Sequence, residues 1–125
     1  QVLDLNGKLF SKAIDKKSAI EQLTSLSGQE HLLITSTVIA KNNTIIWRHL
    51  DESKMKMREM DEKTITQYIS EVGEETFNIV GVYAIEREGI KLFKSISGDV
   101  FSIQGLSMLP LMQFFWDNKV LFKND

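Results

Sequence analysis

The sequence predicts an α/β protein in which hairpins dominate the sheet. Runs rich in β-branched residues alternate with two segments of helical period, and Asn-Gly or Asn-Asn pairs separate neighbouring strand patterns. No repeat, low-complexity tract or linker interrupts the chain. Its 125 residues, 42% of them hydrophobic, suit one domain over residues 1–125 with a modest core.

The N-terminal quarter is predicted to hold a hairpin followed by a helix. Residues 2–5 and 8–11 have strand patterns, and Asn6-Gly7 between them is typical of a type I′ turn. A helix is expected to begin after Asp15, whose side chain can cap it, and to stop at Gly28.

The middle of the chain is predicted to form a longer hairpin and a second helix. Residues 31–40 are rich in β-branched side chains, and Asn42-Asn43 can adopt the positive φ angles of a tight turn. The chain then returns over residues 44–50, and residues 54–58 alternate as a further strand. A capped amphipathic helix is expected over residues 61–73.

The C-terminal part is predicted to begin with a buried strand over residues 79–85. A charged turn over residues 86–89 leads to a strand over residues 90–96, and residues 100–103 follow another turn. A helix is expected over residues 105–116, with Ser107 as a cap.

Composition restricts the classes of function. A net charge of −2 gives no support for a nucleic-acid partner. Because the chain has no cysteine and only two histidines, disulfides and thiolate sites are excluded and a zinc site is disfavoured. His31 and His49 are expected to be surface or edge residues. No apolar run of membrane-spanning length occurs and no signal sequence opens the chain, so a cytoplasmic protein without a membrane partner is expected.

Two charged residues are candidate site residues, each with an ordinary alternative. Lys12 precedes a predicted helix, where it can attract an anion or remain a solvated loop lysine. Glu86 ends the apolar run of residues 79–85, and its carboxylate can face a pocket or point into water. The residues alone do not decide between these interpretations.

Several motifs in a shared order resemble a known family. The stretches SKA, LTSLSG, IIWRH, MKMREMDEKTITQYI, VGVYAIEREGIKLFKSISGDVFSIQGL and MLPL resemble the C-terminal two-thirds of the Maf family, the septum-formation-associated nucleoside-triphosphate pyrophosphatases, over residues 2–113. The resemblance implies a Maf-like (anticodon-binding/ITPase-like) mixed sheet with flanking helices and a cleft between two lobes. It also implies hydrolysis of a nucleoside triphosphate to a monophosphate and pyrophosphate, with Mg²⁺ or Mn²⁺ as the divalent cation.

The resemblance also implies roles for the two candidate residues. Lys12 stands where the family has the phosphate-binding lysine of Gly-Lys-Pro, here between Ser11 and Ala13. Glu86 stands where many members carry Gln and another branch, similar to the 7-methyl-GTP pyrophosphatases, carries Glu. A carboxylate suits a cationic base whose edge donates hydrogen bonds. Arg87 replaces the Gly that usually follows this Glu.

The family's phosphate loop and catalytic Asp correspond to sequence upstream of this chain. We therefore expect a C-terminal fragment of a longer domain, with weak or no hydrolysis by the isolated chain and no catalytic residue to assign within it. The alternative is a non-catalytic nucleotide-binding or cell-division-linked interaction module. A strand edge left unpaired at Gln1 would favour a homodimer.

Overall fold

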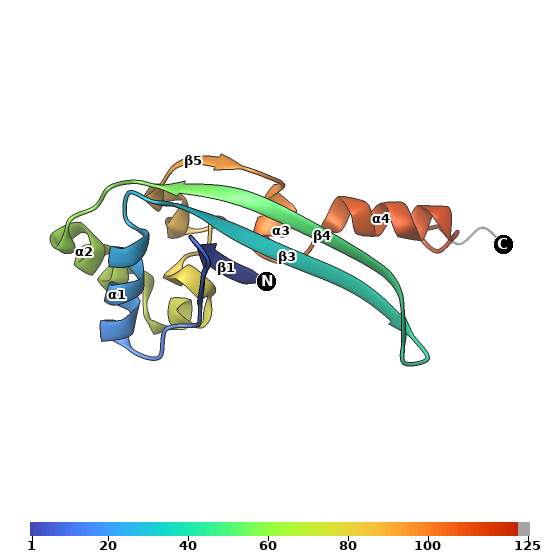
Figure 1. The fold of residues 1–125 in the computed structure, drawn as a ribbon, viewed down its shortest axis with the longest axis horizontal. Helices are drawn as coiled ribbons and strands as arrows, with labels where there is room; N and C mark the ends of the chain where they lie inside the picture. The colour runs from blue at the N-terminus through green and yellow to red at the C-terminus, as the bar shows by residue number, and fades with distance from the viewer. Residues whose placement is uncertain (123–125) are drawn as a thin grey trace.

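The computed structural model describes residues 1–122 and shows a five-stranded sheet with helices packed against it (Figure 1). The strands are β1 (Val2–Leu5), β2 (Lys8–Phe10), β3 (Glu30–Lys41), β4 (Thr44–Met57) and β5 (Phe93–Ser97). The α-helices are α1 (Lys16–Leu26), α2 (Glu62–Val72), α3 (Val100–Gln104) and α4 (Met108–Asp117), and the 3₁₀ helices are η1 (Glu74–Asn78), η2 (Val80–Val82) and η3 (Glu88–Leu92). The predicted α/β class is confirmed.

The sheet has the strand order β2-β1-β3-β4-β5, and every pairing among the described strands is antiparallel. The unpaired strand edge expected at Gln1 is wrong, because β1 pairs with β2 on one side and with β3 on the other. Its two tight hairpins are confirmed. Asn6 and Gly7 have φ angles of 52° and 90°, and Asn42 and Asn43 have 51° and 63°, which are the positive values that a type I′ turn requires. These angles match the right-handed twist of the strands on either side.

The two long helices begin at the predicted caps. The Asp15 side chain accepts a hydrogen bond from the Ser18 backbone N–H at 2.8 Å, and the Asp61 side chain accepts one from the Thr64 N–H at 2.8 Å. Gly73 closes α2 with a φ of 78°, as predicted. Both helices bury one apolar face in a core that they share with the sheet. The core is formed chiefly by Leu3, Leu33, Met55 and Met57 of the sheet, Ala19, Leu23 and Leu26 of α1, and Ile65, Tyr68 and Ile69 of α2.

The predicted buried strand over residues 79–85 is wrong. Gly81 and Val82 have φ angles of 81° and 62°, so the chain turns there through η2 instead of extending. A long-range contact holds this turn, because the Tyr68 hydroxyl of α2 donates to the Val82 carbonyl at 2.8 Å. The segment is buried, as expected from its apolar composition, but as an irregular loop rather than a strand.

Three further boundaries differ from the sequence prediction. The strands expected separately over residues 44–50 and 54–58 are one continuous strand, β4. The strand expected over residues 90–96 is η3 up to Leu92 and then β5 from Phe93. Residues 100–103 form α3, because the Asp99 side chain accepts from the Ser102 N–H at 2.8 Å and caps a short helix.

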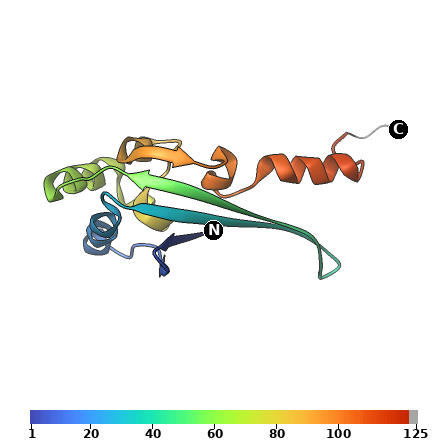
Figure 2. The same cartoon turned by 45° about the horizontal axis from the view of Figure 1, so that its top comes forward.

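The paired ends of β3 and β4 project beyond the rest of the sheet as an arm, residues 35–50 (Figures 1 and 2). β1 pairs with β3 only as far as Ile34, and β5 pairs with β4 only from Lys54. Helix α4 lies beside the arm, with the Trp47 and Phe114 ring centroids 5.6 Å apart. In the described part of α4, no residue is fully buried.

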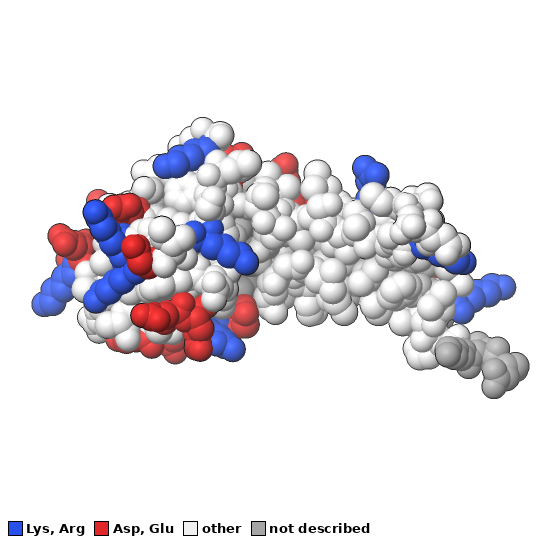
Figure 3. All heavy atoms as spheres, turned by 90° about the horizontal axis from the view of Figure 1, so that it is seen from below, with Lys and Arg blue, Asp and Glu red and all other residues white. Residues whose placement is uncertain are grey.

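Charge is distributed unevenly between the two ends of the molecule. Lys, Arg, Asp and Glu side chains gather over the end that holds α1 and α2, whereas the face of the arm and α4 in the same view has few (Figure 3). Large apolar side chains of the arm and α4 are exposed, including Val38, Leu50 and Leu109 at 51%, 63% and 64%. Among the described residues, no helix is both long and apolar enough to cross a membrane.

Candidate functional site

Glu86 lies on an exposed loop between η2 and η3. The loop is closed by a hydrogen bond from the Arg87 N–H to the Ala84 carbonyl at 3.1 Å. Gly89 packs directly on the same segment, since a Cβ added at Gly89 would lie 2.6 Å from the Ala84 oxygen and 2.7 Å from its nitrogen. Ile85 is buried in the core, so the residue directly before Glu86 is held by packing.

Replacing Gly89 with Ala is expected to lower the free energy of unfolding by about 2–3 kcal/mol, because the added methyl group collides with backbone that cannot move aside. Urea unfolding of the two proteins measures the loss. Gly7→Ala is the matched control: it has a φ of 90° but nothing within 4 Å of the added Cβ, so only the smaller cost of backbone strain, about 1 kcal/mol, is expected. An equal loss in the two variants would contradict the packing role of Gly89.

Two depressions lie beside Glu86. The small cavity, of about 120 Å³, is lined by Gln1, Leu33, Ile79, Val80, Tyr83, Ala84, Ile85, Glu86, Ile103 and Gln104. The acidic groove, of about 410 Å³, has Glu86 at its border together with Glu71, Glu75 and Glu88. Glu86 is thus an exposed residue that lines both depressions, and its role in base recognition stays a prediction.

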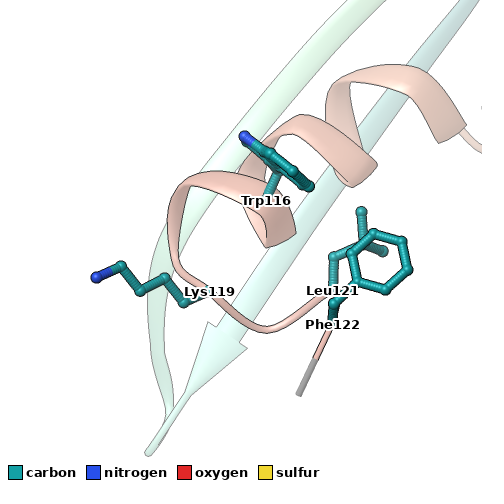
Figure 4. Close-up of a pocket in the computed structure, with 4 residues that line it drawn as sticks. All are labelled: Trp116, Lys119, Leu121 and Phe122. Atoms are coloured by element: carbon teal, nitrogen blue, oxygen red, sulfur yellow. The ribbon is translucent and has the colours of Figure 1, made fainter. Parts of the chain in front are cut away.

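A larger hollow lies at the opposite end of the molecule. It has a volume of about 720 Å³ and is lined by Trp116, Lys119, Leu121 and Phe122 (Figure 4). The Leu121 and Phe122 side chains lie beyond the end of α4, and Lys119 extends away from them. Three of the four residues that line this hollow are apolar, and Glu86 does not line it. The larger volume of the hollow is therefore not a reason to choose it as the functional site.

The small cavity rests on a buried aromatic cluster. Tyr83 and Phe93 pack edge to face with centroids 4.7 Å apart, and the Tyr83 hydroxyl lies 2.7 Å from His31 Nε2. The expectation that His31 is a surface or edge residue is wrong, because it is only 1% exposed. Burial lowers the pKa of His31 to about 4 and raises the pKa of Tyr83, so both groups are neutral at physiological pH. His49 is partly exposed on the arm, as expected.

A polar network holds α3, whose residues Ile103 and Gln104 line another part of the small cavity. The Ser102 hydroxyl lies 2.5 Å from Asp51 Oδ2 and 2.7 Å from the Ser107 hydroxyl, which lies 3.1 Å from the same carboxylate oxygen. These hydrogen bonds, led by that of Ser102, hold the pKa of Asp51 below its ordinary value. Ser107 occupies the predicted cap position of α4, but its side chain bonds Asp51 instead of the helix. The network thereby ties α3 and the start of α4 to β4.

Replacing Ser102 with Ala is expected to lower the free energy of unfolding by about 1–3 kcal/mol, since the buried hydroxyl is the centre of this network. Chemical denaturation checks this expectation. Ser95→Ala, on the exposed face of β5, is the control and should change stability little. Equal stability of the Ser102 variant and the wild type would show that the network does not hold α3.

Lys12 lies apart from both depressions. It is exposed in the loop between β2 and α1, and neither the small cavity nor the acidic groove includes it among its lining residues. The structure therefore does not bring Lys12 and Glu86 together in one pocket, and the phosphate-binding role of Lys12 stays a prediction.

Residues 1–122 of this chain do not by themselves form a binding site for a divalent cation. No three His, Cys, Asp or Glu side chains in this part converge to hold a metal ion. The acidic groove does not meet this condition either, although it contains four glutamates. A metal site built only from these residues is therefore not supported.

Sequence reasoning missed the residues that complete the small cavity, Gln1, Ile103 and Gln104. One local signal was present, because Asp99 followed three residues later by Ser102 is a capping pattern that marks the start of α3. No local signal places this helix at the same cavity as Glu86, since that depends on contacts between segments far apart in the chain.

Comparison with known proteins gives one family and several relatives. The profile of a family described as Maf-like protein matches residues 1–117. A 7-methyl-GTP pyrophosphatase of Bartonella quintana (strain Toulouse) is 44% identical over 112 residues, which are 90% of this chain and 57% of the relative. A nucleoside triphosphate pyrophosphatase of Hyphomonas neptunium (strain ATCC 15444) is 41% identical over 121 residues, 97% of this chain and 61% of the relative. The chain thus spans about three fifths of the length of these curated relatives.

Proposed function

Because the chain belongs to the Maf-like protein family, we propose that it is the base-binding part of a nucleoside-triphosphate pyrophosphatase. Relatives that carry the names 7-methyl-GTP pyrophosphatase and nucleoside triphosphate pyrophosphatase support this proposal. The observation that carries it is the position of Glu86, an exposed carboxylate on a braced loop at the border of two depressions.

Glu86 has the chemistry that a guanine-type base requires. An ionised carboxylate only accepts hydrogen bonds, and the guanine edge offers two donors, N1–H and the N2 amino group. Methylation at N7 makes the base cationic, so the carboxylate adds charge attraction to these bonds. The substrate we propose is therefore a guanine-type triphosphate, with 7-methyl-GTP preferred.

The proposed reaction is attack of water on the α-phosphorus. An oxygen–phosphorus bond forms there, the bond from this phosphorus to the bridging oxygen of the β-phosphate breaks, and pyrophosphate leaves as the water gives up a proton. Lys12 would offset charge on the phosphates. A divalent cation would be carried chiefly by the phosphate oxygens. The carboxylate that takes the proton is assigned by the family resemblance to sequence outside this chain, so we propose weak or no turnover by the 125-residue chain alone.

Pyrophosphate release tests the proposal. The chain and one of its full-length relatives are compared on 7-methyl-GTP, GTP, ATP, CTP and UTP with Mg²⁺ or Mn²⁺. We expect the relative to release pyrophosphate and the 125-residue chain to release little or none. Turnover by this chain at the rate of the relative would disprove the assignment of the catalytic carboxylate to another segment.

A second candidate is a non-catalytic nucleotide-binding or cell-division-linked interaction module, in a cytoplasmic setting. The observation that favours it is the lack of a converging metal-ligand group within residues 1–122. Calorimetry with nucleotides separates the candidates, because binding without hydrolysis in every longer version of the chain would favour the module.

We also propose that the chain self-associates. Beyond Ile34, the outer edge of β3 has no strand paired to it among the described residues, and the adjoining arm exposes apolar side chains such as Val38. Light scattering over a range of protein concentrations is expected to show a mass that rises towards the dimer. A constant monomer mass at high concentration would exclude the homodimer.

A further inference from the structure

We propose that Gln104 is a second specificity-determining residue, which contacts O6 of a guanine-type base while Glu86 contacts N1 and N2. This inference rests on the proposed function and adds to it a residue and a base atom. It starts from the small cavity, where α3 and the Glu86 loop both contribute to the lining.

The polar side chains that line the small cavity differ in whether they are already bonded to other groups of the protein. Gln1 Nε2 already donates to the Ser102 and Ile103 carbonyls at 3.0 and 2.8 Å, and the Tyr83 hydroxyl is bonded to His31. Within residues 1–122, the Glu86 and Gln104 side chains make no hydrogen bond or ion pair with the protein. They are therefore the two polar side chains of the cavity that are free to meet a ligand.

Gln104 is held by a support independent of the Glu86 loop. Its helix α3 is capped by Asp99 and bonded through Ser102 to Asp51 of β4. The Gly105 N–H also donates to the Ser102 carbonyl at 3.0 Å, which closes the helix directly after Gln104. The two side chains thus project from two separately braced walls, and such preorganisation lowers the entropic cost of binding a ligand between them.

The hydrogen-bonding capacities of the two side chains are complementary to guanine. Glu86 supplies only acceptors, whereas the Gln104 amide can donate. Guanine presents an acceptor, O6, beside its two donors, so the amide and the carboxylate can pair with all three groups at once. Adenine presents an acceptor at N1, which would face the carboxylate unpaired. The remaining lining is mostly apolar and the volume is about 120 Å³, which suits the edge of a base, with the phosphates outside.

Calorimetric titration of the 125-residue chain with the monophosphates of guanosine, 7-methylguanosine, inosine and adenosine tests the inference. Gln104→Leu keeps the approximate size and removes the hydrogen bonds. We expect it to weaken binding of both guanosine nucleotides and of inosine monophosphate about tenfold, because all three have O6, and to leave adenosine monophosphate unchanged. Gln67→Leu, the same change on α2, is the control and should have no effect.

Inosine separates the two assignments, because it keeps O6 and N1–H but lacks the N2 amino group. Glu86→Gln should therefore cost less binding free energy with inosine than with guanosine, whereas Gln104→Leu should cost the same with both. Equal weakening of all four ligands, or wild-type affinity, in the Gln104 variant would overturn the inference and leave the proposed function standing. No binding of any nucleotide by the wild type would overturn both.

Discussion

Lowering the pH from 7 to 4 is expected to reduce the free energy of unfolding by about 3 kcal/mol through His31 alone. Burial lowers the pKa of His31 from 6.5 to about 4 in the folded state. Between these values the unfolded chain binds a proton that the folded protein does not, so acid favours unfolding. The contribution of His31 to the free energy of unfolding is fully present above pH 6.5 and is lost progressively as the pH decreases. Below pH 4 no further loss occurs.

Urea unfolding at pH 7, 6, 5 and 4 measures this dependence. Carboxylates whose pKa values are lowered, such as Asp15 and Asp61, also lose stabilising bonds in acid. The comparison is therefore made with His31→Leu, which should have a flatter pH profile between pH 6.5 and 4. Ser95→Ala, on the exposed face of β5, is the control, since it removes no titratable group and should keep the wild-type profile. Identical profiles for the wild type and the His31 variant would show that the buried imidazole does not control acid stability.

Replacing Glu86 with Gln is expected to reduce the preference for a 7-methylated over an unmethylated guanine nucleotide by about ten- to a hundredfold. The change removes the negative charge that attracts the cationic base and turns one of two acceptors into a donor, which would face the N2 amino group. Binding constants for 7-methylguanosine and guanosine monophosphates measure the preference.

Glu88→Gln is the matched control for this prediction. Glu88 belongs to the same charged triplet, but it pairs with Lys91 and does not line the small cavity. Its replacement should leave the preference unchanged. If both variants lost the preference equally, the effect would come from the net charge of the loop and not from a contact made by Glu86.

The parts of the fold that the sequence predicted correctly depend on neighbouring residues. The Asp15 and Asp61 caps and the Asn42-Asn43 turn are decided within a few positions, and all three occur in the structure. The loop at Gly81 and Val82 depends instead on a hydroxyl from α2, and an apolar run gives no sign of such a partner.

In the candidate site, too, the features that sequence patterns could not predict depend on residues far apart in the chain. Glu86 was found because of the family resemblance, and alternation alone left its environment open. His31 was misplaced because its partner Tyr83 lies 52 residues away. Gln104 could not be found from local patterns, because its place in the same cavity as Glu86 depends on the packing of α3 against β4 through Ser102 and Asp51.

Titration of isotope-labelled chain with 7-methylguanosine monophosphate, followed by amide chemical shifts, tests most directly whether this chain carries the base-binding part of a nucleotide site. We expect the largest shifts in the Glu86 loop, residues 83–89, and at Gln104, with little change along the arm. Absence of shifts, or shifts confined to the hollow around Trp116 and Phe122, would contradict the account.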